Sequence, residues 1–147
     1  MLATTHSLTS ALIFNKVSPP ALSLALVLVF HYLLDLIPHW DTGSGLTNGF
    51  KTKRKALVET IIDLGIAAVV IFFLFQKGNP FSPLLWGGVI LGILPDLLEF
   101  PSLFLGIRPF PLNHLERFHT EIMHRRGKLP WGFLTQLILM ALIFLFL

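Results

Sequence analysis

Residues 31–41 read His-Tyr-Leu-Leu-Asp-Leu-Ile-Pro-His-Trp-Asp, and they close an apolar run, Ala21 to Phe30, that contains no charged residue. His31, Asp35 and His39 follow one another at four-residue intervals, so they share one face of a helix for as long as the helix lasts. The proline of this stretch disfavours helical geometry at the residue before it and predicts a kink or a helix end there. Ionisable groups on so apolar a helix are costly inside a membrane and are therefore functional candidates.

The composition predicts one integral membrane domain over residues 1–147, because 54% of the chain is hydrophobic and only 13% is charged. The absence of cysteine excludes disulfides, thiolate metal sites and cysteine nucleophiles. The net charge of +3 does not require a nucleic-acid partner, since basic residues of a membrane protein act through their placement. We expect membrane lipids and a small-molecule or lipid substrate as partners, and no nucleic acid.

Prolines and turn residues divide the apolar pattern into helical segments. Segment 3–16 is barely long enough to span a bilayer at ~1.5 Å per residue, which favours a tilted or half-inserted helix. The expected fold class is an all-α membrane protein, a compact polytopic bundle of about five helices. An amphipathic interfacial segment, 101–128, is expected between the fourth and fifth. The expected helices are 3–16, 20–37, 54–76, 82–100 and 130–147.

This topology gathers the polar residues at one membrane face. The second and third predicted helices are joined by a loop that need not cross the membrane, and the fourth helix returns to the same side. Lys16 and Lys77 lie in the two opposite turns, whereas the other nine basic residues lie on the polar side. By the positive-inside rule that side is the cytoplasm. The sequence therefore predicts a multi-pass protein of the cell inner (plasma) membrane with its polar face cytoplasmic.

Neutral imidazoles beside carboxylates suit a divalent transition metal such as Zn, Mn or Fe. His31 and Asp35 form a ligand pair on one rigid helix, and the His and Asp past the proline would complete a shell or bridge a second ion. Asp96 and Glu99 offer an acidic pair from another helix. A centre of one or two ions polarises a phosphoryl group and generates hydroxide at neutral pH.

Other charged residues have two interpretations. Glu59 and Asp63 either pair with Lys55 and its neighbours or join the metal site, and the sequence leaves both open. Among the histidines of the interfacial segment, His119 and His124 are the preferred ligand pair, because one regular helix cannot aim all three inward. The basic run that precedes the third helix is suited to holding a substrate phosphate. That run consists of Lys51, Lys53, Arg54 and Lys55.

Three short motifs, Thr5-His6-Ser7, His31-x3-Asp35 and Pro95-Asp96, resemble those of the bacterial membrane-bound metal-dependent hydrolase family of LexA-regulated inner-membrane type. The run at 31–41 also looks like that of uncharacterised small membrane proteins from environmental bacterial genomes. The resemblance implies a membrane hydrolase that holds metal through His6, His31, Asp35 and Asp96. The chain departs from the family pattern, since no second Asp and no His follow Asp96 as in Pro-Asp-x-Asp-His.

The expected function is that of a metal-dependent hydrolase acting at the cytoplasmic membrane face on a phosphate-containing lipid or polyprenyl headgroup. The alternatives are a non-catalytic metal- or haem-binding or transport membrane protein, and a structural membrane protein held by a polar His/Asp network. Crowding of the polar residues on one side counts against a transport pathway. The candidate catalytic residues are Asp35, Asp96 and Glu99, and the candidate metal ligands are His6, His31, Asp35, His39, Asp41, Asp96, His119 and His124.

Overall fold

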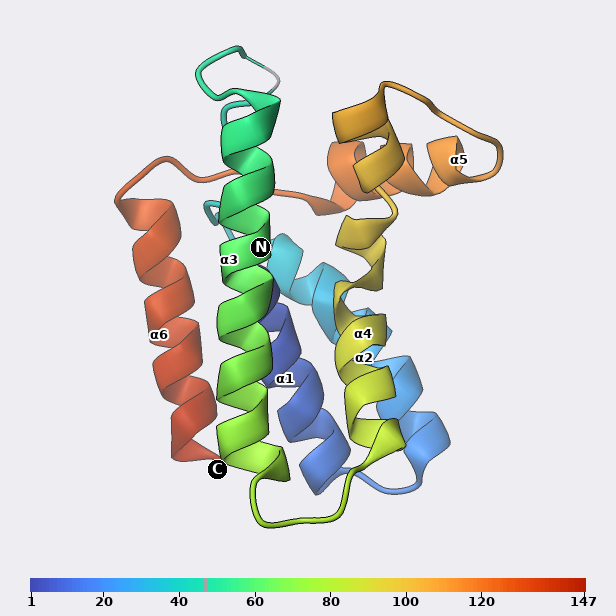
Figure 1. The fold of residues 1–147 in the computed structure, drawn as a ribbon, viewed down its shortest axis with the longest axis vertical. Coiled ribbons are helices and arrows are strands. Elements are labelled where there is room, and N and C mark those ends of the chain that lie inside the picture. The colour runs from blue at the N-terminus through green and yellow to red at the C-terminus, as the bar shows by residue number, and fades with distance from the viewer. Residues whose placement is uncertain (47) are drawn as a thin grey trace.

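The computed structural model describes residues 1–46 and 48–147, and over those residues the chain is all-helical, as its sequence predicts (Figure 1). The α-helices are α1 (Ala3–Lys16), α2 (Pro20–Asp35), α3 (Lys53–Ile71), α4 (Pro83–Leu97), α5 (Leu112–Arg117) and α6 (Trp131–Leu145). Three π-helical segments continue or connect them, η1 (Phe72–Gln76), η2 (Pro101–Leu105) and η3 (Phe118–Met123).

The helix bounds differ in detail from those predicted. α2 ends at Asp35 rather than at residue 37, because Pro38 restricts the backbone before it. α4 ends at Leu97 rather than at residue 100. The predicted interfacial segment is interrupted by prolines and by Gly106, whose φ of +72° ends η2. The described chain therefore has six α-helices where about five were expected, and the additional one is α5.

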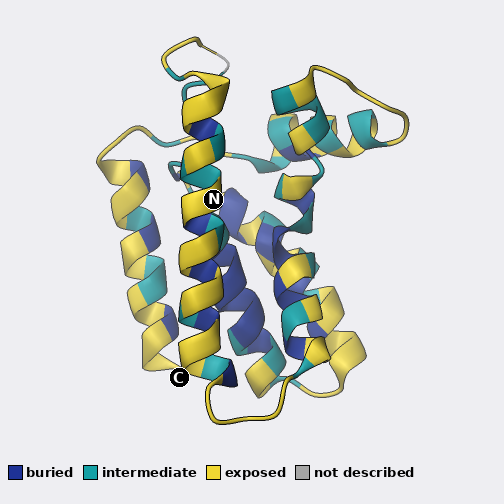
Figure 2. Cartoon of the chain, viewed as in Figure 1, coloured by how far each residue is buried: buried dark blue, intermediate teal, exposed yellow. Residues whose placement is uncertain are grey.

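α1 lies at the centre of the bundle and contacts α2, α3, α4 and α6 (Figure 1). Thr4 to Ala11 are all buried, so the helix that was expected to be tilted or half-inserted is enclosed by its neighbours (Figure 2). Two of its hydroxyl groups bond to the backbone of the same helix. Thr9 Oγ1 donates to the backbone oxygen of Thr5 at 3.0 Å, and Ser10 Oγ donates to that of His6 at 2.8 Å.

The glycines of α4 allow this central position. A Cβ atom at Gly92 would lie 1.9 Å from Ser10 Oγ, and one at Gly88 would lie 2.0 Å from a ring carbon of Phe14. Only glycine therefore permits the two helices to approach so closely.

Two continuous helical stretches are long and apolar enough to cross a membrane, Lys53–Gln76 and Pro83–Leu105, with mean hydropathies of 2.4 and 1.7. α2 and α6 are apolar but shorter. Large apolar side chains of α3 face outward, and Ile61 is 60% exposed. Such exposure is expected of a helix that contacts lipid. The number of crossings and the orientation in the membrane stay predictions.

The polar ends of the helices meet at one end of the bundle. α1, α3 and α6 begin there, α2 and α4 end there, and α5 lies beside them (Figure 1). Backbone hydrogen bonds also join two distant segments at this end. Arg125 N donates to Asp35 O at 2.8 Å, and Gly127 N donates to His39 O at 2.6 Å. These bonds lay residues 125–127 along the exit of α2.

Candidate metal centre

Five of the six histidines converge with three aspartates where α1, α2, α4 and η3 meet. Asp35 lies in the middle and is fully buried. Its Oδ1 lies 3.2 Å from His6 Nε2 and 3.5 Å from His39 Nε2. Its Oδ2 lies 2.8 Å from His119 Nε2 and 3.3 Å from His31 Nε2. Four imidazole nitrogens from three separate segments therefore surround one carboxylate.

The ligand atoms fall into three overlapping groups, in each of which all atoms lie within 4.8 Å of one another. The first and second groups share Asp35, and the second and third share His124. Such overlap fits two neighbouring ions as well as one. The groups are His6, His31, Asp35 and Asp96; Asp35, His119 and His124; and His39, Asp41 and His124.

Three of the imidazoles are held by their Nδ1 atoms. His31 Nδ1 lies 2.7 Å from the backbone oxygen of Gly92, and His39 Nδ1 lies 2.8 Å from the backbone oxygen two residues before it. His119 Nδ1 lies 2.7 Å from Glu99 Oε1. Because these oxygens accept, each Nδ1 carries a proton, and a ring that is neutral then presents the lone pair of Nε2 to the cluster. Ligating histidines in metal sites are oriented in the same way.

Four buried polar atoms of the cluster residues have no hydrogen-bond partner, and His39 Nε2 and Asp96 Oδ2 are two of them; the others are His6 Nδ1 and His124 Nδ1. Asp96 Oδ2 lies 3.7 Å from His6 Nε2. Leaving a buried donor or acceptor unsatisfied costs about 1–3 kcal/mol, so each such atom calls for an explanation. A cation in the cluster satisfies His39 Nε2 and Asp96 Oδ2, and the mixture of imidazole nitrogen and carboxylate oxygen suits Zn, Mn or Fe. The donor set therefore fits a divalent metal.

The electrostatics of the cluster also permit a metal-free network. Burial lowers the pKa of His119, but its hydrogen bonds to Asp35 and Glu99 outweigh burial and raise that pKa to about 10. A protonated His119 then balances part of the negative charge. The amino group of Met1 lies 2.6 Å from Asp35 Oδ1 and adds a second positive charge. In the metal-free network, these two cations supply the positive charge that a bound metal ion would otherwise provide.

The third ligand group lies in the loop that follows α2. Burial lowers the pKa of His39 to about 3, so this imidazole is neutral at pH 7. Burial by itself raises the pKa of Asp41, but the hydrogen bond with His124, 2.8 Å long, contributes to a net lowering. A neutral imidazole and an ionised carboxylate are the protonation states that metal ligands require.

The structure places some candidate residues away from the cluster centre. Glu99 orients His119 instead of pointing at the middle of the site. Lys51 Nζ lies 2.6 Å from Glu59 Oε2, so Glu59 pairs with a basic neighbour of Lys55, which is the first of the two interpretations given for it. Lys53 Nζ donates to the backbone oxygen of Phe104 at 3.1 Å. Arg54 and Lys55 are exposed at the start of α3.

Asp63 has a structural role that the sequence did not reveal. Its carboxylate accepts from Ala3 N at 2.6 Å and from Thr4 N at 3.2 Å, and so caps the first turn of α1. Gln136, also missed, is fully buried; its Nε2 donates to Trp40 O at 2.7 Å and its Oε1 accepts from Leu2 N at 2.8 Å. The only feature of the sequence that could have indicated this role is the presence of a glutamine in an otherwise apolar helix.

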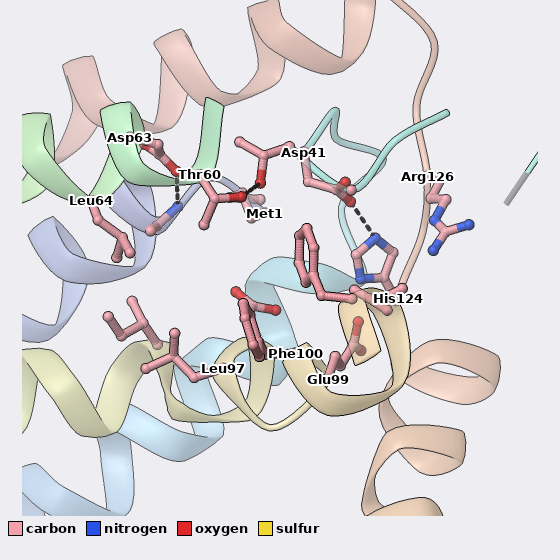
Figure 3. Close-up of a pocket in the computed structure, with 17 residues that line it drawn as sticks. Met1, Asp41, Thr60, Asp63, Leu64, Leu97, Glu99, Phe100, His124 and Arg126 are labelled. Carbon is pink, nitrogen blue, oxygen red and sulfur yellow. Dashed lines mark hydrogen bonds and ion pairs between the residues drawn. The ribbon is translucent and has the colours of Figure 1, made fainter. Parts of the chain in front are cut away.

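A cavity of about 100 Å³, here called the α3–α4 cavity, adjoins the centre (Figure 3). Its lining combines polar side chains with apolar side chains of α3, α4 and η2. In Figure 3, Leu64 and Leu97 lie at one end of the cavity and His124 and Arg126 at the other. The lining includes Asp41, Glu99, His124, Leu64, Leu97 and Phe100.

Comparisons with known proteins find no match. No protein-family model matches the chain, and neither does any curated protein or solved structure at significant similarity. The family resemblance inferred from the three short motifs therefore stays a prediction.

Proposed function

We propose that the protein is a membrane hydrolase that holds one or two divalent metal ions in the His/Asp cluster and cleaves a phosphate ester. The observation that carries this proposal is the convergence of imidazole Nε2 atoms on Asp35 while the Nδ1 atoms of His31, His39 and His119 are held by oxygens. Two acceptors that face one another at such distances repel unless a proton or a metal ion lies between them. Several imidazoles arranged in this way favour the metal ion.

Asp35 and the imidazoles around it serve as ligands in this proposal. A bound divalent ion would polarise a phosphoryl oxygen and lower the pKa of a water molecule. Glu99 holds His119 in the tautomer that leaves Nε2 free for the site. Glu99 is thus a positioning residue and not the catalytic carboxylate that the sequence suggested.

Asp96 is the carboxylate best placed to meet substrate. Its side chain is 28% exposed, whereas that of Asp35 is fully buried, and it lines the α3–α4 cavity. Its Oδ2 lies beside the imidazole of His6 without a hydrogen bond. A carboxylate in this position accepts a proton from an attacking water molecule as a general base.

The membrane location is part of the proposal. The cavity lies between α3 and α4, which belong to the two stretches long enough to cross a bilayer. The polar end of the bundle carries nine of the eleven basic residues, which favours a cytoplasmic face of the inner membrane. A haem site has less support, because each group of candidate ligands also contains a carboxylate.

The second candidate function is a structural membrane protein whose polar cluster joins the helices. It is favoured by the raised pKa of His119 and by the amino group of Met1 at Asp35. In that case the carboxylates are neutralised by protonated groups, and no metal is needed.

Elemental analysis of the purified protein in detergent, with its visible spectrum, separates these possibilities. We expect one or two equivalents of Zn, Mn or Fe, no haem absorption, and hydrolysis of a phosphate ester by the metal-loaded protein. His31→Ala is expected to lose both metal and hydrolysis while circular dichroism shows the helices intact. If His31→Ala binds as much metal as the parent protein, His31 is a structural hydrogen-bonding residue and the proposed site is wrong.

A further inference from the structure

A second hollow adjoins the metal centre on its outer side. It has a volume of about 590 Å³ and is here called the basic hollow. It shares Leu103, His124 and Arg126 with the α3–α4 cavity. The two spaces therefore meet at a metal-ligand candidate, with Arg126 beside it (Figure 3). The charged residues that line the basic hollow are Lys51, Lys53, Arg108, Arg126 and Glu116.

The basic hollow is suited to an anion. Four of its lining side chains are cationic, and two carboxylates offset part of this charge, Glu59 at 2.6 Å from Lys51 and Glu116 at 3.8 Å from Arg108. Cationic side chains outnumber carboxylates in the lining by four to one. Guanidinium groups bind phosphate oxygens through paired hydrogen bonds, so the two arginines fit a phosphate group. Neither arginine was assigned to the site from the sequence.

The opposite part of the α3–α4 cavity is suited to hydrocarbon. Leu64 comes from α3, Ile93 and Leu97 from α4, and Phe104 from η2. Leu97 is 38% exposed, so its side chain also contributes to the outer surface of α4. In Figure 3, Leu64 and Leu97 lie on the side away from Arg126. Such a lining accommodates a hydrocarbon chain without leaving a buried polar group unsatisfied.

We propose, on the basis of the proposed hydrolase function, that the substrate is an anionic lipid phosphate bound across both spaces. Its phosphate group lies at the metal centre and against Arg126 in the basic hollow, and its hydrocarbon chain lies in the α3–α4 cavity between the two helices. The basic hollow and the metal-binding cluster lie next to each other and suit the charged phosphate group, and the apolar surface that follows them suits the hydrocarbon chain of such a lipid. A water-soluble ester does not need the apolar lining, and a neutral lipid does not need the basic one.

The test uses the full-length protein, loaded with Zn, in nanodiscs of phosphatidylcholine. The probe is a non-hydrolysable phosphonate analogue of phosphatidic acid with a photoreactive diazirine in its acyl chain. We expect crosslinks at residues 64, 93, 97 and 104, mapped by mass spectrometry. Unlabelled phosphonate lipid should compete with the probe, whereas an equal concentration of inorganic phosphate should not. A diacylglycerol probe with the same diazirine should label these positions about tenfold less, because it lacks the charged head.

Two pairs of matched variants locate the head and the chain. Leu97→Trp should reduce crosslinking about tenfold by filling the cavity, whereas Ile62→Trp, on the exposed side of α3, should not. Arg126→Ala should reduce it about tenfold and Arg126→Lys should restore part of it. Arg117→Ala is the control, because Arg117 is exposed and pairs with Glu121 outside the hollow. Crosslinking of Lys53→Ala tests the contribution of the basic hollow independently of Arg126.

The outcomes separate this proposal from the hydrolase proposal. Crosslinks spread evenly over the outer helix faces, equal labelling by diacylglycerol, or full competition by inorganic phosphate would each overturn the lipid-phosphate site. Hydrolysis of a water-soluble phosphate ester in the same preparation would then leave the hydrolase proposal standing. Specific crosslinking without metal binding or hydrolysis would give the reverse result, a lipid-phosphate site in a protein that is not a hydrolase.

Discussion

The two ends of the helical bundle each hold a buried polar group, and the two differ in how their hydrogen bonds are satisfied. At the end opposite the His/Asp cluster, Gln76 Nε2 donates to Asn79 O at 3.1 Å and to Pro80 O at 2.7 Å. Its Oε1 accepts from Ser82 N and from Trp86 Nε1, both at 3.1 Å. Every polar atom of this amide has a partner of opposite hydrogen-bonding character, as expected of a structural network.

The His/Asp cluster has the opposite character. His39 Nε2 and Asp96 Oδ2 are buried without hydrogen bonds, and the Nε2 atoms of His31 and His39 lie 3.3 and 3.5 Å from the carboxylate of Asp35. The comparison shows that burial of polar groups does not by itself indicate function. A network whose donors and acceptors match one another holds helices together, whereas a network of converging acceptors requires a cation. The following experiments test that distinction, from the largest expected effect to the smallest.

Asp35→Asn should have the largest effect, because it removes the charge around which the other ligands are arranged. We expect metal affinity to fall by more than ~100-fold, since changing a residue that only supports a ligand already costs 10–100-fold. Isothermal titration with Zn and elemental analysis measure the change, and circular dichroism checks the fold. Unchanged metal stoichiometry in this variant would contradict the assignment of Asp35 as a ligand.

Removal of the metal should lower the stability of the parent protein. A metal at a hundred times its dissociation constant stabilises the folded state by about 2.7 kcal/mol, provided that it binds only that state. Thermal unfolding in detergent, with EDTA and again with added Zn, should therefore show a reversible shift in Tm. Asp35→Asn serves as the control and should show none. A parent protein that is insensitive to both EDTA and Zn would support the metal-free network.

Glu99→Gln should have an intermediate effect, because Glu99 orients a ligand without being one. The expected loss is about 10–100-fold in metal affinity, with the number of bound ions unchanged at saturating Zn. Titration at increasing Zn concentrations separates a lower affinity from a lost site. A fall in stoichiometry that excess Zn does not restore would make Glu99 a direct ligand.

Gln76→Leu should leave metal binding unchanged. It removes the partners of two donors and two carbonyl oxygens at the far end of the bundle, so the free energy of unfolding should fall by about 1–3 kcal/mol. Denaturant titration measures that change, and elemental analysis provides the comparison with Asp35→Asn. Loss of metal in Gln76→Leu would mean that metal content follows general stability rather than the cluster.

Local features of the chain were predictable from the sequence. The helix breaks follow from prolines and turn residues, which restrict the backbone wherever they occur. The presentation of His31 and Asp35 on one face follows from helical periodicity alone. Asp41 and His39 could be expected near them because only a short, proline-containing segment intervenes. These inferences concern neighbours in the chain, where geometry depends on a few backbone angles.

The roles of the remaining polar residues were decided by the tertiary structure. Asp63 and Asp96 are both acidic residues on apolar helices, yet the first caps α1 and the second keeps a buried oxygen without a hydrogen bond. Arg126 reaches the centre because residues 125–127 pair with the exit of α2, far away in the sequence. Whether a carboxylate is satisfied or available depends on which backbone donors distant helices bring to it. That information lies in the packing of α1 at the middle of the bundle and not in the spacing of residues along the chain.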